Sequence, residues 1–596
     1  MIAATPAASD IPLRLGDFDT LTDALDYAAT GKTGINFYAS NGKLQTALTY
    51  ADLRADAIDM SKRLVPLAPK GALVGLIAQT SPAFVRTFFA CQYAGLVPVP
   101  MPMPTTMGGK DAYLNQIRQM CEAAKVAALF APERLIEMLS ETLSAIKIPL
   151  LNITDADDLS APATAPASKL RKHDADGLCY IQYSSGSTND PKGVIGSQAS
   201  VTANCHGIIA HGLKVRPGDR AVSWLPLYHD MGLVGFLIAP MMSQLSLDLM
   251  APSDFARRPL TWLEIISQNK GTLSYSPSFG YELCVKRWRG DKQFDLSSWR
   301  AAGIGGDMVR SNALTSFAET FSDHGFSDTS FVPSYGMAEV TLAIAFAPLG
   351  KGATADIIDN NLLRRSEEAL PASEITQAAA KRTFILCGEV LPSHEMVVRS
   401  NNGELLGDRK VGRICVRGPS VTPGYYLNEA ATRAAISEDG WLETGDLGYS
   451  LNGQIVITGR SKDLILAHGR NIWPQDLEWA VEGAVTSRIG RTAAFPIENE
   501  SGSDDIVLLV ECRSRNPENL VRLHAEASAA ARTAANAAVH IGLVPLSSLI
   551  VTSSGKISRA RARQKFVGGG FEDLTQTALA GPHKQIAATG TNADVR

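Results

Sequence analysis

The 596-residue sequence lacks any cysteine pattern typical of disulfides or metal binding. It contains no C-x-x-C pair and no His/Cys cluster with the spacing of metal ligands. Isolated thiols are typical of buried free cysteines in a reducing compartment. We therefore expect a cytoplasmic protein without disulfides. Its eight cysteines lie at positions 91, 121, 179, 205, 284, 387, 415 and 512.

The sequence also lacks a segment that could enter or cross a membrane. The N-terminal stretch MIAATPAASDIPLRLGDFD has no basic region followed by an apolar one, so it does not have the pattern of a secretory signal. The longest apolar run, residues 232–242, is shorter than the about 20 residues that a bilayer span needs. We expect a soluble protein with no integral membrane segment.

An excess of positive charge is missing as well. The formal net charge is -4 and there is no long basic run, so a nucleic-acid partner has no electrostatic support. Hydrophobic residues at 45% and charged residues at 19% are globular values and exclude a largely disordered chain. The length exceeds one ordinary hydrophobic core, which predicts two or more structural units.

What the sequence does contain, up to about residue 460, is an alternation of helical and strand-like segments. Residues 81–94 have a helical pattern, whereas residues 73–78 and 177–183 are short apolar strands. This alternation predicts an α/β architecture with a largely parallel sheet. Residues 350–381 form a polar stretch longer than most loops inside compact domains, and such loops are usually functional or disordered.

The composition changes after residue 458. A strand-like segment at residues 506–511 and an Ala-rich helix at residues 520–538 predict a smaller C-terminal unit, with a boundary near residues 460–463. The last segment, residues 567–596, is rich in Gly, Ala and Thr, and we expect it to be poorly ordered.

The stretch SSGSTNDPKG, residues 184–193, gathers small hydroxyls, glycine and one lysine. Backbone N–H groups, hydroxyls and an ammonium together suit phosphate oxygens, so this loop is a candidate cradle for a triphosphate. A hydrophilic turn is the alternative for such a loop taken alone. The candidate phosphate contacts are Ser184, Ser185, Gly186, Ser187, Thr188, Lys192 and Gly193.

Three rival motifs fail on spacing. A Walker A loop needs glycine before the lysine, but Pro191 precedes Lys192. The segment GIGGDM, residues 303–308, lacks the third glycine of a dinucleotide-binding fingerprint. The segment SPSFG, residues 276–280, lacks the first glycine of a nucleophile elbow.

Four later segments, SYGMAEVTL, GWLETGDLGY, GRSKDLILAHGRNIWPQDLE and TSSGKISR, follow the loop in this order. Together with it they resemble the adenylate-forming superfamily of acyl-CoA synthetases, adenylation domains and luciferases, across residues 180–563. Within that superfamily, WLPLYHDMGLVG, SPSFGYELCVKR, DLSSWRAAGIGGD and RGPSVTPGYY look most like fatty acyl-AMP ligases.

This resemblance implies a function and an architecture. Fatty acyl-AMP ligases activate a fatty acid with ATP and Mg²⁺, then pass it to the phosphopantetheine thiol of an acyl carrier protein, which here would act in trans. The implied architecture is a large N-terminal adenylate-forming domain of layered α/β subdomains, residues 1–460, and a small mobile α+β domain, residues 461–566. Residues 350–381 lie where that family carries an insertion associated with rejecting free coenzyme A.

Adenylation brings two anions together, a carboxylate and the α-phosphate of ATP. At about 4 Å, two unit charges repel by roughly 4 kcal/mol at an effective dielectric of 20, so cations must converge there. By resemblance, Lys556 would reach the carboxylate and the α-phosphate, Lys192 would assist pyrophosphate departure, and His229 would lie beside the carboxylate. Glu339 would bind Mg²⁺ with help from Thr188.

The nucleoside of ATP needs its own contacts. Asp446 would accept hydrogen bonds from both ribose hydroxyls, which suits a cis-diol, and Arg460 would join it there. The neighbouring Lys462 lies where the family places its hinge between two domain poses. Tyr335 would stack on adenine. The segment formed by Gly305, Gly306 and Asp307, and the motif residues Gly336 and Met337, would complete the nucleotide site.

The acyl chain needs an apolar cleft, whose candidate walls can equally be ordinary core. Two alternatives to the carrier-protein ligase stay open: an acyl-CoA synthetase that uses free coenzyme A, and a catalytically silent nucleotide-binding paralogue. The candidate wall residues are Trp224, Leu225, Met231, Phe236, Phe279 and Tyr281.

Overall fold

The computed structural model describes residues 3–6, 8–104, 109–153, 170–183, 191–373, 377, 380–467, 470–485, 488–498, 504–551 and 556–576. Its centre is a nine-stranded sheet in the order β17-β14-β13-β12-β11-β9-β10-β1-β2. The six strands from β13 to β1 run parallel, whereas β2, β14 and β17 pair antiparallel at the two edges. The strands are β1 Gly34–Tyr38, β2 Leu44–Thr49, β9 Arg220–Ser223, β10 Ser246–Met250, β11 Leu273–Ser276, β12 Ala301–Ile304, β13 Phe331–Gly336, β14 Ala343–Phe346 and β17 Glu389–Val390.

Two further sheets complete the N-terminal part. A four-stranded parallel sheet has the order β4-β3-β5-β6, and a four-stranded antiparallel sheet has the order β18-β19-β20-β21. The remaining strands form two hairpin-like pairs, β7 with β8 and β15 with β16. Their bounds are β3 Leu73–Ile77, β4 Val97–Met101, β5 Leu129–Ala131, β6 Leu150–Asn152, β7 Leu178–Tyr183, β8 Gly193–Ser197, β15 Ala355–Asp359, β16 Lys381–Ile385, β18 Glu395–Arg399, β19 Gly412–Arg417, β20 Leu442–Leu451 and β21 Gln454–Arg460.

The helices start and stop where local chemistry predicts. In α3, the Ser81 hydroxyl accepts from the Phe84 N–H, Pro82 occupies the first turn, and Gly95 ends the helix in the left-handed conformation. The other helices of the N-terminal part are α1 Leu21–Ala28, α2 Tyr50–Leu64, α4 Lys110–Ala124, α5 Glu133–Ala145, α7 Gln198–His206, α8 Ala239–Met242, α9 Pro252–Arg257, α10 Leu260–Asn269, α11 Ser278–Arg287, α12 Ser311–Phe321, α13 Asn360–Ser366 and α14 Glu429–Ala435, with α3 itself at Pro82–Ala94.

Two π-helices stand beside the central sheet, η2 at Gly207–Gly212 and η3 at Met231–Ile238. The second contains most of the apolar run at residues 232–242, whose residues are almost all buried. The run is therefore core rather than a membrane segment. No helix in the described part of the chain is long and apolar enough to span a bilayer.

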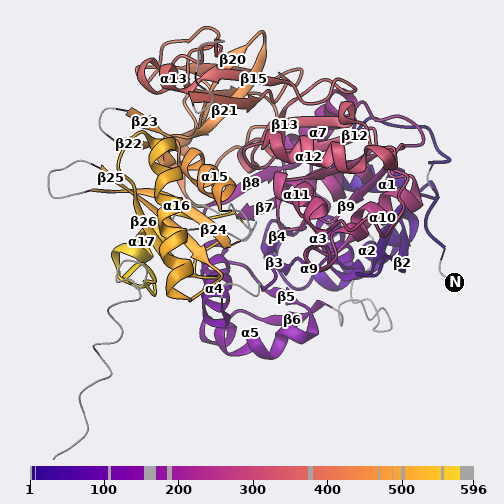
Figure 1. The fold of residues 1–596 in the computed structure, drawn as a ribbon. Coiled ribbons are helices and arrows are strands. Elements are labelled where there is room, and N and C mark those ends of the chain that lie inside the picture. Colours follow the sequence, from indigo (N-terminus) through magenta and orange to yellow (C-terminus); the bar gives the residue numbers. More distant parts are fainter. Residues whose placement is uncertain are drawn as a thin grey trace, which may run out of the picture.

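The C-terminal part has its own hydrophobic core and lies at one side of the molecule in Figure 1. Its three-stranded sheet has the order β24-β25-β26 and packs against α15 and α16. The elements are η8 Ser461–Asp463, β22 Ile465–Ala467, β23 Arg470–Ile472, α15 Pro474–Ala484, β24 Ile489–Glu498, β25 Asp504–Cys512, α16 Pro517–Ala535, β26 His540–Pro545 and α17 Arg559–Val567. The boundary expected near residues 460–463 falls at the end of β21.

Two expectations need correction. Residues 350–373 are not a structureless loop, because they contain β15 and α13. The first part of the expected tail is also anchored: Leu574 is 6% exposed within the C-terminal core, and its N–H donates to the Leu543 carbonyl. A single leucine can fix a Gly-rich segment by burial, which composition does not reveal. Residues 577–596 lie outside the described part.

Candidate active site

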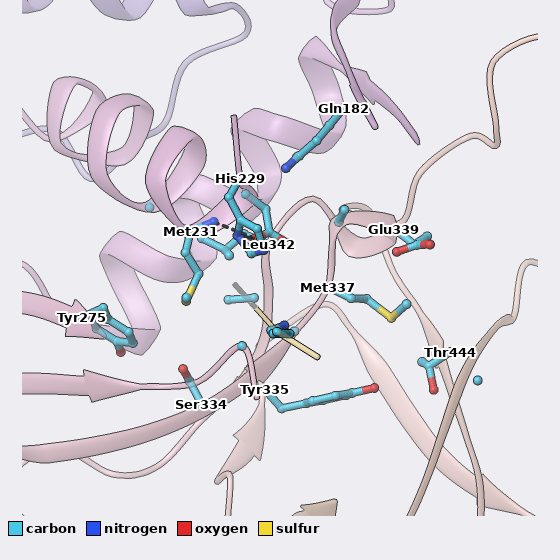
Figure 2. Close-up of a pocket in the computed structure, with 18 of the residues that line it drawn as sticks. Gln182, His229, Met231, Tyr275, Ser334, Tyr335, Met337, Glu339, Leu342 and Thr444 are labelled. Carbon is cyan, nitrogen blue, oxygen red and sulfur yellow. Dashed lines mark hydrogen bonds and ion pairs between the residues drawn. The ribbon is translucent and has the colours of Figure 1, made fainter. Parts of the chain in front are cut away.

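A cavity of about 510 Å³ lies between the central sheet, the β20–β21 hairpin and the C-terminal part. Figure 2 shows Tyr335, Met337 and Glu339 around it, with His229 on the side opposite Tyr335. The structure therefore brings together residues that lie more than 350 positions apart in the sequence. The predicted site residues that line it are Lys192, His229, Gly306, Tyr335, Gly336, Met337, Glu339, Arg460, Lys462 and Lys556. Ser184, Ser185, Gly186, Ser187 and Thr188 lie outside the described residues.

The end expected to hold the ribose is built by strand register. Asp446 on β20 lies directly opposite Arg460 on β21, and Arg460 Nε is 3.4 Å from the Asp446 carboxylate. The Tyr335 hydroxyl donates to the other oxygen of Asp446 at 2.7 Å. Burial raises the pKa of the Asp446 carboxyl, against the charge of Arg460 and the Tyr335 hydrogen bond. Asp446 is thus a buried acceptor held by two donors.

The segment expected to contact adenine, residues 305–307, follows directly after β12. A Cβ added to Gly305 would lie 2.9 Å from the Ser334 carbonyl oxygen, so β12 and β13 approach closely there. Gly306 has a φ of +79° and lines the cavity, a conformation that favours glycine. Asp307 turns toward α11, where its carboxylate lies 3.4 Å from the Ser278 hydroxyl.

Glu339 lies on the short 3-10 helix η6, Ala338–Val340, at the cavity wall. The Tyr425 hydroxyl donates to one of its carboxylate oxygens at 3.0 Å, and Lys192 Nζ lies 5.3 Å from the centre of the Tyr425 ring. Burial raises the pKa of Glu339, against the Tyr425 hydrogen bond and the charge of Arg460. Tyr425 was not predicted, although it stands in the motif RGPSVTPGYY.

The described residues contain no group of three or more His, Cys, Asp or Glu side chains able to hold a metal. A single carboxylate at a cavity wall nevertheless fits Mg²⁺, which keeps waters and substrate phosphates as most of its ligands. Glu339, with one oxygen engaged by Tyr425, is the described residue that would hold such an ion.

Lys556 reaches the cavity from the C-terminal part. It precedes α17, whose first residue, Arg559, is fixed by ion pairs to Asp463 and Glu478 at 2.9 and 2.7 Å. Burial lowers the pKa of Lys556, and so does the nearby charge of Arg460. Carboxylates act in the opposite direction, Asp307 first and then Asp230 and Asp446. Three carboxylates therefore lie near the lysine and favour its charged form.

His229 ends the turn that precedes η3, and its N–H donates to the Pro226 carbonyl at 3.1 Å. Its Nδ1 lies 2.5 Å from Oδ1 of Asp230, which also accepts from the Met231 N–H at 2.7 Å. Asp230 was not predicted as a site residue. The only sequence signal for it is its place beside His229 in the motif LYHDMGL.

One arm of the cavity is apolar. Met231 and Phe236 line it, as expected, together with Ile208, Leu213, Leu342 and Phe346. Trp224, Leu225 and Tyr281 do not line it: Tyr281 and Trp224 are buried in an aromatic cluster around Trp262. Phe279 is 42% exposed and contacts Trp224 edge-on. The two candidate wall residues on α11, Phe279 and Tyr281, therefore lie outside the cavity lining.

Comparison with known proteins identifies the family of this chain. The family described as AMP-binding enzyme matches residues 27–426. The chain belongs to the AMP-binding enzyme family. It is therefore an adenylate-forming enzyme of the ligase class, as the motifs predicted.

Individual relatives agree over nearly the whole chain. A protein of Caulobacter vibrioides, provisionally named an acyl-CoA synthetase, is 45% identical over 96% of this chain and 99% of its own. A medium-chain-fatty-acid–[acyl-carrier-protein] ligase of Moorena producens is 30% identical over 93% and 96%. A structure from a study of fatty acyl-adenylate ligases from E. coli and L. pneumophila superposes with a TM-score of 0.89, at 39% identity, over 94% and 99%. The expected fold class, a large N-terminal and a small C-terminal domain, is confirmed.

Proposed function

We propose that this enzyme activates a medium- or long-chain fatty acid with ATP, giving acyl-adenylate and pyrophosphate. It then transfers the acyl group to the phosphopantetheine thiol of an acyl carrier protein that acts in trans. The observation that carries this proposal is the composition of the cavity. Lys556 and an apolar arm around Phe236 line the same space as Tyr335 and Arg460. Tyr335 and Arg460 in turn hold the buried diol acceptor Asp446.

Each end of the cavity has one task in the first half-reaction. Asp446 and Arg460 bind the ribose, Tyr335 stacks on the adenine, and the arm takes the acyl chain out of water. Lys556 neutralises charge that develops as the carboxylate attacks the α-phosphate. Glu339, with Thr188, would hold Mg²⁺, which when bound neutralises phosphate oxygens. Lys192, on the wall beside Tyr425, assists the departure of pyrophosphate.

The second half-reaction needs the site to open to a thiol. We infer that Lys462, on η8 between β21 and β22, is the hinge between an adenylating pose with Lys556 in the cavity and a thioester-forming pose. The domains then divide as residues 1–460 and 461–566. Contacts that a swing must break include the ion pair of Arg310 with Glu482 at 2.9 Å.

The acceptor thiol separates the two candidate functions. The name of the Moorena relative favours a carrier protein, and the name of the Caulobacter relative favours free coenzyme A. Residues 350–381, which we expect to be an insertion, favour the carrier protein by their position, because α13 contacts the C-terminal part: Asn360 and Arg364 donate to Asp476 at 3.4 and 3.2 Å. An insertion that touches the moving part is well placed to limit which thiols enter.

The test is a divided reaction. Purified enzyme is incubated with ATP, Mg²⁺ and dodecanoic acid, and coenzyme A is added to one half and phosphopantetheinylated carrier protein to the other. Both halves are analysed by mass spectrometry. Acylated carrier protein in one half and no acyl-CoA in the other would support the proposal. Acyl-CoA as the main product would make the enzyme an acyl-CoA synthetase, and a lack of acyl-AMP with acids of every length would refute adenylation.

A further inference from the structure

His229 and Asp230 form a pair whose geometry fixes a proton. Two unprotonated acceptors would repel at the 2.5 Å that separates Nδ1 from Oδ1, so one of the two carries a proton. Oδ1 of Asp230 already accepts from the Met231 N–H, so it acts as an acceptor and does not carry the shared proton. The proton between the two groups therefore lies on Nδ1 of the imidazole.

Asp230 is held in place by the helix that it starts. Its Oδ1 accepts from the Met231 N–H at the first turn of η3, and its side chain is only 10% exposed. π-helical turns are rare and frequent at functional sites. A carboxylate fixed in this way orients the adjacent His229 imidazole through Nδ1, and the second ring nitrogen, Nε2, does not contact Asp230.

The free nitrogen, Nε2, belongs to a ring that lines the cavity and is 21% exposed. The His229 imidazole has no hydrogen-bond partner other than Asp230 in the described part of the chain. With Nδ1 protonated, the neutral ring carries its lone pair on Nε2 and can accept a proton. No other described residue of the cavity wall is an imidazole.

A proton acceptor has a use in the transfer step. An alkyl thiol has a pKa near 8.5, so most of it is protonated at pH 7, and the thiolate is the nucleophile. Glu339 and Asp446 have the Mg²⁺ ion and the ribose as expected partners. Glu443, which also lines the cavity, pairs with Arg413 at 2.8 Å. Lys556 is expected at the carboxylate and the α-phosphate. His229 is the remaining group suited to take the thiol proton.

We propose that Asp230 is a positioning residue that holds His229 with Nδ1 protonated, and that Nε2 of His229 takes the proton of the incoming thiol. The thiol proton moves to Nε2 as the C–S bond forms. The C–O bond to the phosphate breaks, and AMP leaves with the electron pair. Asp230 stabilises the imidazolium that results. This step rests on the transfer half of the proposed function.

The kinetic test separates transfer from adenylation. Purified acyl-AMP is mixed with enzyme and carrier protein in single turnover, and acyl-AMP formation is measured in a separate assay. In Asp230→Asn and His229→Gln, transfer is expected to fall by about 100-fold, since general-base catalysis contributes roughly 10²–10⁴-fold. The fall should exceed that of acyl-AMP formation by at least about tenfold. Equal losses in both assays, or undiminished transfer, would overturn the proposal.

A spectroscopic test reads the tautomer itself. In ¹⁵N-histidine-labelled enzyme, the resonance pair lost in His229→Gln assigns His229. We expect an unprotonated Nε2 in the unmodified enzyme and in Asp307→Asn, which removes another carboxylate facing Lys556. Asp230→Asn should mix the tautomers. A protonated Nε2 in the unmodified enzyme contradicts the proposal. If acyl-AMP forms but no thiol is acylated, the transfer step and this inference both fail while adenylation stands.

Discussion

Lys556 carries the adenylation chemistry in a way that can be tested at a single residue. We predict that Lys556→Ala lowers acyl-AMP formation by at least about 100-fold, because a transition-state cation is lost, and leaves ATP binding nearly intact. Pyrophosphate release and calorimetric titration with ATP measure the two effects. Lys565→Ala is the matched control, since Lys565 lies on α17 outside the cavity lining and donates to the Ser548 carbonyl. Retained adenylation in Lys556→Ala would reject the role.

The Tyr425 hydrogen bond gives a pH prediction at the same scale. Burial raises the pKa of Glu339 and the Tyr425 hydroxyl lowers it, so Tyr425→Phe should raise the pKa further. Mg²⁺ binds the ionised carboxylate, and activity is therefore lost as pH falls through this pKa. We expect the acid limb of the profile of kcat/KM for ATP, at fixed Mg²⁺, to move to higher pH in Tyr425→Phe.

The control for that profile is Tyr27→Phe, which removes a hydroxyl bonded to the Pro12 carbonyl far from the site. An acid limb that stays in place in Tyr425→Phe, or moves equally in Tyr27→Phe, would show that this hydrogen bond does not tune Glu339.

Most of the residues that line the cavity lie within the motifs quoted from the sequence, because each motif is a short segment that passes along the cavity wall. Tyr425 and Asp230 were missed for a physical reason. Their parts depend on which atom a side chain reaches across the fold, and neither spacing nor composition encodes that direction. The loop at residues 184–190 stays a prediction, as do the individual roles.

At the scale of elements, η3 forms one wall of the apolar arm and gives a prediction about chain length. A Cβ added to Gly235 would lie 3.1 Å from Cδ2 of Leu342, and both residues line the cavity. Gly235→Val should therefore narrow the arm and lower kcat/KM for dodecanoic acid by about 10- to 200-fold, with a smaller loss for hexanoic acid. Pyrophosphate release with acids of graded length measures this.

Gly407→Val is the control, because a Cβ at Gly407 would have no atom within 4 Å. An unchanged preference in Gly235→Val would place the acyl chain elsewhere. The sequence predicted strands and α-helices at this scale from apolar periodicity, but not the π-helices η2 and η3. An extra residue in a helical turn leaves no mark on periodicity that distinguishes it from an ordinary helix.

At the scale of the whole molecule, the N- and C-terminal parts share a buried charge cluster. Asp476 pairs with Arg364 at 3.2 Å and with Arg382 at 3.0 Å, and the two arginine side chains are 6% and 7% exposed. Asp476→Ala leaves two buried guanidinium groups without their carboxylate, so we expect a loss of about 3–5 kcal/mol of stability. Calorimetry should show a lowered first unfolding transition.

The control is Glu429→Ala, which removes an ion pair with Arg433 whose side chains are 88% and 74% exposed. Its effect should stay within about 0.5 kcal/mol. Equal effects of the two substitutions would mean that the cluster contributes nothing specific to the contact between the two parts.

The division into a large and a small unit could be predicted from the change of composition after residue 458, since each unit buries its own apolar residues. How the two units meet could not. The cluster at Asp476 joins α13, inside the 350–381 segment, to α15. Neither spacing nor composition indicates that this polar stretch contacts the C-terminal part.

All eight cysteines of the chain are free and buried. Burial raises the pKa of each of these thiols, so maleimide reagents should react slowly with the folded enzyme. One cysteine introduced on the exposed surface of each unit would then take up a fluorescent dye selectively. The distance between the two dyes during turnover would test the proposed swing of the small domain without removal of any native thiol.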